Sequence, residues 1–202
     1  MLKKETLLYI HGKGGNAAEA GHYKTLLPNC SVTGLDYRYS TPWETKAEFL
    51  HAYTKSADHS DGISIIANSI GAYFAMNAFQ NVKIKRAFFI SPIVDMEKLI
   101  TDMISAAAIT QSELKSKKEI KTPFGQTLSW EYFSYVKTHP LKWTFPTHIL
   151  YGGKDMLTSK STISAFAEKT GATLTVMENG EHWFHTAEQM YFLDNWLKQY
   201  FN

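Results

Sequence analysis

Three residues of the types that perform nucleophilic catalysis each follow a strand-like segment: Ser69, Asp155 and His182. A serine hydroxyl is a weak nucleophile until a base removes its proton, and imidazole, whose ordinary pKa is about 6.5, can do so near neutral pH. A carboxylate beside the imidazole fixes its tautomer and stabilises the imidazolium that forms. The chain order serine, acid, histidine therefore predicts acyl transfer through an acyl-enzyme.

Ser69 lies in the segment 67–71 (ANSIG), after an apolar run and before a run rich in small residues. A nucleophile raised on a sharp strand-to-helix turn needs small residues two positions to either side, because the backbone is crowded there. The usual pattern is G-x-S-x-G, and Ala67 replaces its first glycine while still meeting the steric requirement. A serine in an ordinary turn before a helix gives the same pattern, so the motif alone is moderate support.

A glycine-rich turn from Gly12 to Ala17 follows the first strand-like segment and allows two interpretations. Glycines let backbone N–H groups face a developing anion, so the N–H groups of Lys13 and Ile70 would form the oxyanion hole of a hydrolase. The turn also matches the dinucleotide fingerprint G-x-G-x-x-G/A, and Asp36 lies roughly 20 residues further on, where a ribose-binding acid is expected. The N-terminal part of the sequence alone does not decide between them.

The C-terminal half favours the hydrolase interpretation. Asp155 follows a strand-like run and a glycine pair, and His182 follows the next strand-like run. The catalytic groups of a triad converge at the carboxyl edge of a parallel sheet, each after its own strand. A dinucleotide-binding protein has no reason to place Ser69, Asp155 and His182 in this way, so we interpret the glycine turn as an oxyanion loop.

Each of the two supporting roles has a rival residue. Asp95 is the alternative acid, because it follows the fourth strand-like segment, but the strand and glycine turn before Asp155 are the more usual arrangement. His185 is the alternative base, and it directly precedes Thr186, a residue typical of helix N-caps. We therefore expect His185 at the entrance of the last helix, facing away from Ser69. With no further Cys or His at ligand spacing, the histidine pair does not predict a metal site.

The segments that must position these residues alternate between strand and helix patterns. Most of the strand-like segments are near-continuous apolar runs, which are typical of strands buried on both faces of a parallel sheet. Capping signals at Thr41 and Thr186 mark helix starts between and after them. The alternation predicts a single α/β domain over residues 1–202 with right-handed crossovers. The expected strands are residues 6–11, 31–36, 63–68, 86–91, 148–151 and 173–177.

Residues 96–146 interrupt this alternation with about 50 residues between two strands, far more than a loop and one helix need. The segment contains helical patterns at 97–108 and 130–138 and many aromatic residues. Long insertions of this kind often form lids or substrate-binding caps. An additional packing layer is the alternative.

Composition limits the partners of the chain. The 202 residues are 44% hydrophobic and 20% charged, and the net charge of +2 is scattered, so no surface for nucleic acid or an anionic membrane is predicted. The single cysteine, Cys30, cannot form an internal disulfide and favours a reducing compartment. Without a signal-peptide core or an apolar stretch of about 20 residues, we expect a cytoplasmic protein.

At His11, Gly12 and the segments 67–71, 152–155 and 180–182, the sequence resembles the α/β-hydrolase superfamily, and the resemblance extends over nearly the whole chain. It is similar to compact bacterial serine esterases that lack the two N-terminal strands of larger relatives. The resemblance implies a parallel sheet of about six strands in the order 2-1-3-4-5-6, helices on both faces and a helical insertion after strand 4.

The same resemblance implies hydrolysis of an ester, thioester or amide. The complete triad and the aromatic insertion favour a small-molecule carboxylic ester with a small or medium acyl group, hydrolysed without a cofactor. A thioesterase or peptidase with the same triad is the alternative. A nucleotide-binding protein that uses Gly12 to Ala17 and Asp36 is the less favoured one.

Overall fold

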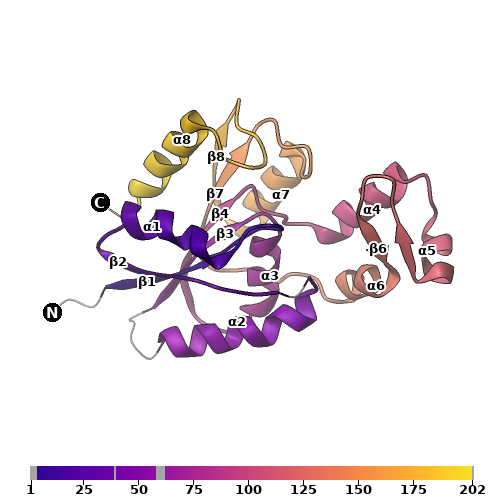
Figure 1. Cartoon of the computed structure of the whole chain (residues 1–202), viewed down its shortest axis with the longest axis horizontal. Helices are drawn as coiled ribbons and strands as arrows, with labels where there is room; N and C mark the ends of the chain where they lie inside the picture. Colours follow the sequence, from indigo (N-terminus) through magenta and orange to yellow (C-terminus); the bar gives the residue numbers. More distant parts are fainter. Residues whose placement is uncertain (1–3, 39, 58–61, 202) are drawn as a thin grey trace. The chain divides into compact units, whose positions relative to one another are not determined.

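The computed structural model describes residues 4–38, 40–57 and 62–201. In this part of the chain the main sheet has six strands, all paired in parallel, in the order β2-β1-β3-β4-β7-β8 (Figure 1). The predicted parallel α/β architecture is confirmed, and the labels β7 and β8 arise because two short strands outside this sheet precede them. The strands are β1 (Glu5–Ile10), β2 (Cys30–Gly34), β3 (Ile63–Asn68), β4 (Ile84–Ile90), β7 (Thr147–Gly152) and β8 (Thr173–Met177).

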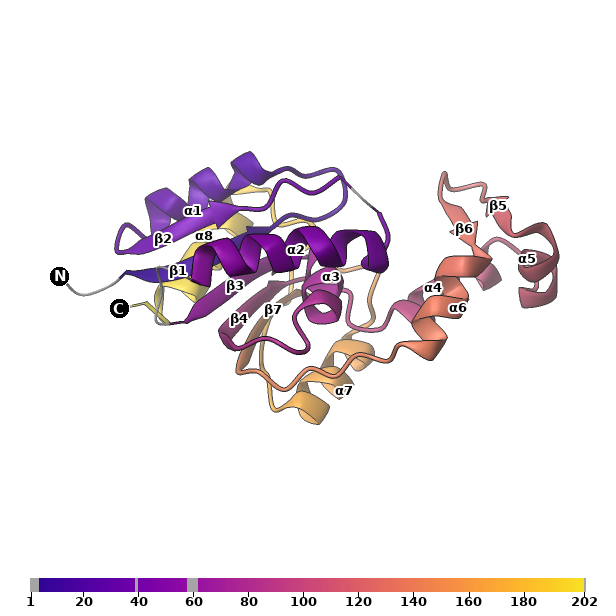
Figure 2. The same cartoon turned by 90° about the horizontal axis from the view of Figure 1, so that it is seen from below.

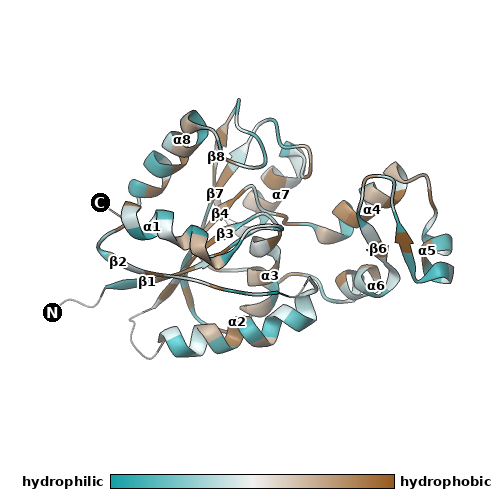
Figure 3. Ribbon diagram, in the orientation of Figure 1, coloured by the Kyte–Doolittle hydropathy of each residue, from teal (hydrophilic) through white to brown (hydrophobic). Residues whose placement is uncertain are grey.

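Helices cover both faces of this sheet because side chains alternate between the faces along each strand. Helices α1 (Ala20–Leu26) and α8 (Ala187–Lys198) pack on one face, and α2 (Pro42–Ala57), α3 (Ile70–Ala78) and α7 (Lys160–Thr170) cover the other (Figures 1 and 2). On the first face, buried residues of all six strands of this sheet form one core with α1 and α8. Helices α2 and α8 carry both hydrophilic and hydrophobic residues, as amphipathic helices on a sheet do (Figure 3).

The boundaries follow the local sequence signals. Strands β3 and β8 have the predicted bounds, and the other four differ by one or two residues. Helix α8 begins after Thr186, whose side chain accepts a hydrogen bond from the backbone N–H of Gln189 and so forms the predicted N-cap. No helix in the described ranges is long and apolar enough to cross a membrane.

The chain divides into two compact units, one of residues 1–94 with 142–202 and one of residues 95–141. The second unit contains α4 (Met96–Ala106), α5 (Gln111–Lys117), the strands β5 (Glu119–Lys121) and β6 (Thr127–Ser129), and α6 (Trp130–Thr138). Strands β5 and β6 pair antiparallel, and buried Leu114, Leu128 and Phe133 form part of the interior of this unit. The role of the insertion as a lid or cap, and the assignment of the chain as one domain, stay predictions.

Candidate active site

Ser69 connects β3 to α3 at a sharp turn. It has a φ of +52° and a ψ of −122°, a backbone conformation that residues with a side chain rarely adopt. Small neighbours make the turn possible: a Cβ on Gly71 would lie 2.4 Å from the carbonyl oxygen of His11, and one on Gly12 would lie 3.2 Å from the Cβ of Ser69. Ala67 is fully buried. The turn therefore has the crowded geometry expected of a nucleophile elbow, with alanine in place of the first glycine.

The three residues predicted as a triad lie in direct contact. The Nε2 of His182 is 2.7 Å from the Oγ of Ser69, and its Nδ1 is 2.7 Å from the Oδ2 of Asp155. The Asp155 side chain is fully buried, and its Oδ1 accepts hydrogen bonds from the backbone N–H groups of Leu157 (2.7 Å) and Thr158 (3.2 Å). The imidazole thus bridges a hydroxyl and a carboxylate that is held rigidly by the backbone.

Glycines bring the loops after β7 and β8 together. A Cβ on Gly152 would lie 2.4 Å from the carbonyl oxygen of Glu181, and one on Gly153 would lie 2.5 Å from that of Glu178. The backbone N–H of Lys154 donates to the carbonyl oxygen of Gly180. This close approach of the two loops sets the distance between the acid and the histidine.

The rival acid, Asp95, has a different local partner. Its carboxylate accepts a hydrogen bond from the backbone N–H of Lys98 at 2.8 Å and so forms the N-cap of α4. Asp95 belongs to the second compact unit, whereas Asp155 contacts His182 within the first.

The rival base, His185, does not face away from Ser69 as expected, because it lines the same cavity. Its Nδ1 is 2.7 Å from the carbonyl oxygen of Trp183, and its ring stacks on the Trp183 ring. The backbone N–H of His185 donates to the side chain of Gln189 in the first turn of α8. The short loop before α8 therefore keeps both histidines at the cavity, and His182 is the one in contact with Ser69.

The two predicted oxyanion donors belong to the start of α3 and to the glycine turn after β1. Ile70 is the first residue of α3, where backbone N–H groups have no acceptor within the helix. Lys13 belongs to the glycine turn that lines the cavity together with Ser69. His11 stabilises the turn through two contacts. Its Nδ1 is 2.8 Å from the carbonyl oxygen of Gly12, and its own carbonyl accepts a hydrogen bond from the Tyr37 hydroxyl at 2.7 Å.

The elements of the nucleotide-binding interpretation face different cavities. Gly12, Gly14 and Gly15 line the cavity beside Ser69. Asp36 lines a second cavity of about 630 Å³, between the end of β2 and helix α2, together with Glu48 and His51. A dinucleotide that spans a phosphate loop and a ribose-binding acid needs both at one site. The arrangement therefore does not favour this alternative.

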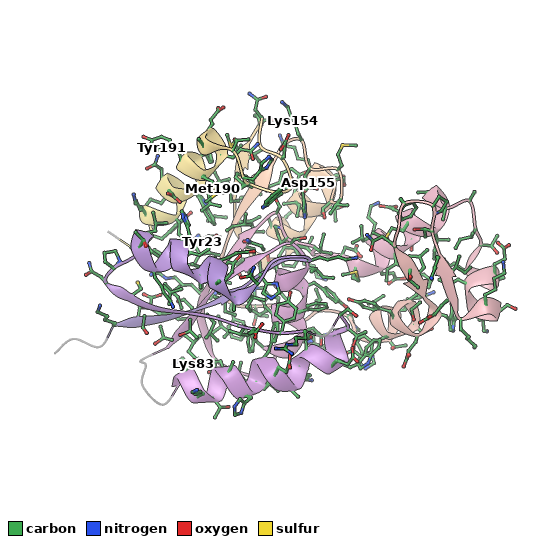
Figure 4. All side chains as sticks on the ribbon, viewed as in Figure 1. Tyr23, Lys83, Lys154, Asp155, Met190 and Tyr191 are labelled. Carbon is green, nitrogen blue, oxygen red and sulfur yellow. The ribbon has the colours of Figure 1, made fainter. Side chains whose placement is uncertain are left out.

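The cavity beside Ser69 and His182 has a volume of about 690 Å³. The labelled side chains of Tyr23 on α1 and Met190 on α8 are two of those that line it, and Asp155 is labelled in the loop after β7 (Figure 4). One part of the wall is apolar, with buried Ile90, Phe184 and Leu193 among its residues. Another part is polar and consists of Tyr9, Glu19, His22, Tyr23 and Asn68.

Local sequence signals do not predict this polar wall. His22 had no recognisable partner in the sequence, but its Nε2 lies 2.7 Å from the Oδ1 of Asp194 on α8. Glu19 had a local signal, because Asn16 and Glu19 form a capping box at the 3-10 helix η1 (Ala17–Glu19). No signal pointed to Tyr9, whose position in the site depends on the pairing of β1 with β3. In the described ranges, no three His, Cys, Asp or Glu residues come together as a metal site.

A scan against protein-family models gave no match, and neither did a search of curated proteins. Solved structures do match. Alpha/beta hydrolase domain-containing protein 10 from mouse is 15% identical with a TM-score of 0.76, covering 96% of this chain and 88% of that one. Est1E from Butyrivibrio proteoclasticus is 18% identical with a TM-score of 0.74, covering 98% and 87%.

The esterase Pf2001 from Pyrococcus furiosus is 19% identical with a TM-score of 0.62, covering 98% of this chain and 81% of that one. These likenesses extend over almost the whole chain. Together with the parallel sheet, they show that the chain has the α/β-hydrolase fold, and at this level the resemblance noted in the sequence is confirmed.

Proposed function

We propose that the protein is a serine hydrolase that cleaves a carboxylic ester with a small or medium acyl group through an acyl-enzyme. One observation carries the proposal: the His182 imidazole lies at hydrogen-bond distance from both the Ser69 hydroxyl and the buried Asp155 carboxylate. This arrangement activates a serine hydroxyl for attack on an acyl carbon.

In the first half of the reaction, the Oγ of Ser69 attacks the ester carbonyl carbon while the Nε2 of His182 takes the hydroxyl proton. The carbonyl oxygen becomes an oxyanion, and the backbone N–H groups of Lys13 and Ile70 are the donors proposed to stabilise it; each such donor contributes about 10²–10³ in rate. The bond to the leaving oxygen then breaks, and His182 returns the proton to the departing alcohol.

In the second half, His182 takes a proton from a water molecule, whose oxygen attacks the acyl carbon of the acyl-enzyme. Collapse of this second intermediate breaks the bond to the Oγ of Ser69, which regains its proton from His182. Throughout, the Asp155 carboxylate keeps the Nδ1–H of His182 directed toward itself and stabilises the imidazolium. The net reaction converts an ester and water into a carboxylic acid and an alcohol.

Three considerations favour an ester as the substrate. A cavity of about 690 Å³ opens beside the nucleophile and accommodates a small organic group. Several structures with the same fold are esterases by their titles, and another, Est1E, is described with bound ferulic acid. An ester also needs less assistance to its leaving group than an amide. A thioesterase or a peptidase with the same triad is the alternative.

The proposal includes the partners and the location of the enzyme. We propose a small-molecule substrate and no cofactor. The small, scattered net charge agrees with the absence of a nucleic-acid or membrane partner. A cytoplasmic location agrees with the single cysteine, Cys30.

The test is covalent labelling of the folded protein with a fluorophosphonate probe, followed by peptide mapping, together with a panel of p-nitrophenyl esters of increasing acyl length. We expect one adduct on Ser69, loss of the adduct and of ester hydrolysis in Ser69→Ala, and the highest kcat/KM for short or medium acyl groups. Separate His182→Ala and His185→Ala variants identify the base, and we expect the large loss in the first. Labelling at another residue, or undiminished hydrolysis by Ser69→Ala, would refute the proposal.

A further inference from the structure

A chain of hydrogen bonds leads from the residue beside the nucleophile along the cavity wall. The side-chain amide of Asn68 donates to the hydroxyl of Tyr9 at 3.0 Å. The Tyr9 hydroxyl in turn donates to the Oε2 of Glu19. All three side chains line the cavity that also contains Ser69 and His182. This chain of hydrogen bonds therefore ends in a carboxylate.

The Glu19 carboxylate has a fixed place in this wall. Its Oε1 accepts the backbone N–H of Asn16 at 3.1 Å, which is one half of the capping box of η1. A Cβ on Gly15 would lie 2.6 Å from the same oxygen, so the glycine turn leaves space for the carboxylate and not only for an oxyanion. A carboxylate is a pure acceptor with about four lone-pair sites. The hydrogen bonds from the Asn16 backbone and the Tyr9 hydroxyl use about half of them.

The hydroxyl groups around Glu19 stay protonated. Burial, followed by the neighbouring Tyr23 and Glu19, raises the pKa of Tyr9 far above its ordinary value. Burial, followed by the charges of Glu19 and Asp194, raises the pKa of Tyr23 as well. Tyr9 thus remains a neutral donor to Glu19.

The wall residues Ile90, Phe184 and Leu193 make another part of the same cavity apolar. A purely aliphatic or aromatic substituent would fill the apolar part but would cover the Glu19 carboxylate without replacing its hydrogen bonds to water, which costs free energy. A substituent with an apolar body and a terminal donor satisfies both parts of the cavity.

We propose that Glu19 determines substrate specificity by accepting a hydrogen bond from a hydroxyl or ammonium group at the end of the substrate portion that occupies this cavity. The inference rests on the proposed function, because it takes Ser69 as the reacting centre. It adds the chemical class of the substrate: an ester with an apolar body that ends in a hydrogen-bond donor.

The experiment measures kcat/KM for two matched series of esters. In the 4-nitrophenyl 3-arylpropanoates the aryl ring carries a para methyl, hydroxyl or aminomethyl group on the acyl side, and in the 3-arylpropyl acetates it carries the same groups on the alcohol side. We expect the hydroxyl or aminomethyl ester to exceed the methyl ester by roughly tenfold in one of the series, as a hydrogen bond to a charged acceptor predicts. If kcat/KM is higher for the aminomethyl ester than for the hydroxyl ester and this difference falls with added salt, the group that donates to Glu19 is an ammonium. The reverse order of kcat/KM identifies a neutral donor.

The matched variants are Glu19→Gln and Glu168→Gln. Glutamine keeps the capping box but removes the charge, so the donor preference should fall by roughly tenfold in Glu19→Gln. Glu168 lies on the exposed side of α7, outside the cavity, and its substitution should leave the preference unchanged. Equal kcat/KM for the three groups in both series, or an unchanged preference in Glu19→Gln, would overturn the inference while leaving hydrolysis by Ser69 intact. Activity that survives in Ser69→Ala would instead refute the proposed function.

Discussion

The two oxygens of the Asp155 carboxylate have different hydrogen-bond partners. Oδ2 faces the Nδ1 of His182, whereas Oδ1 accepts two backbone N–H groups from the turn that follows β7. The turn therefore fixes the carboxylate, and the carboxylate fixes the imidazole. Because the acceptor toward the Nδ1 of His182 must be an oxygen, the tautomer that the proposed mechanism requires, with Nε2 able to take the proton of Ser69, depends on this one atom.

Asp155→Asn should lower kcat by about 10⁴, because the amide retains the turn but presents an N–H to Nδ1 and favours the wrong tautomer. The measurement is steady-state hydrolysis of a p-nitrophenyl ester, with thermal unfolding to show that the variant is folded. Asp95→Asn is the matched control, since asparagine is as good an N-cap as aspartate and α4 should keep its cap. The larger loss in Asp95→Asn would reverse the assignment of the acid.

At the scale of an element, the turn between β3 and α3 combines strain with crowding. The backbone of Ser69 is held at positive φ by pairings on both sides: its N–H donates to the carbonyl of Ile90 at 3.0 Å, and its carbonyl accepts the N–H of Ile93 at 3.1 Å. Strain of this kind costs about 1–3 kcal/mol and persists only where the surrounding structure imposes it. The turn thus lowers the stability of the fold while placing the half-buried Ser69 at the cavity.

A comparison of two variants of Ser69 measures this strain. Ser69→Gly should have a free energy of unfolding about 1 kcal/mol higher than Ser69→Ala, because glycine adopts this φ without a Cβ clash, even after its larger entropy in the unfolded chain is included. Urea unfolding at neutral pH gives both values. Equal stability of the two variants would mean that the turn is not strained.

The elements that local sequence signals predict well are those with long apolar runs or strong caps. Strand β3 has a near-continuous apolar run, and α6 has its N-cap at Ser129, so both have the predicted bounds. Strands β5 and β6 have three residues each and no apolar run, so their pairing could not be read from periodicity. The contacts of His182 with Ser69 and Asp155 were predictable because each of these residues follows a strand. The contact of Tyr9 with Glu19 was not predictable, because it depends on the folded position of η1 relative to β1.

At the scale of the molecule, a cluster around Glu5 ties three strands and the C-terminal segment together. Arg86 on β4 and Lys85 contact the Glu5 carboxylate, as does the hydroxyl of Ser64 on β3. Arg86 also donates to the carbonyl of Tyr200 at 2.8 Å. Burial alone would raise the pKa of Glu5, but hydrogen bonds from Arg86, Lys85 and Ser64 outweigh it and hold the pKa below its ordinary value.

The sign of the resulting pH dependence follows from this depressed pKa. The carboxylate contributes stability that is fully present above the ordinary value of 4.5 and is lost as the pH falls through the lower pKa of the folded state. Unfolding in urea at neutral and acid pH should therefore show a smaller loss of stability for Glu5→Gln than for the unchanged protein. Parallel pH profiles of the two proteins would contradict the role of this cluster.

His182 follows β8, the last strand of the main sheet and one of its edges. A ribosome-bound chain from which Ser69 and Asp155 have already emerged still lacks His182, the proposed base, and the α8 helix that closes one core. Under the proposed function, such a nascent chain cannot turn over substrate, however complete its N-terminal strands are. Appearance of ester hydrolysis during translation or refolding would therefore report the docking of the final strand and helix, and the enzyme would serve as its own folding reporter.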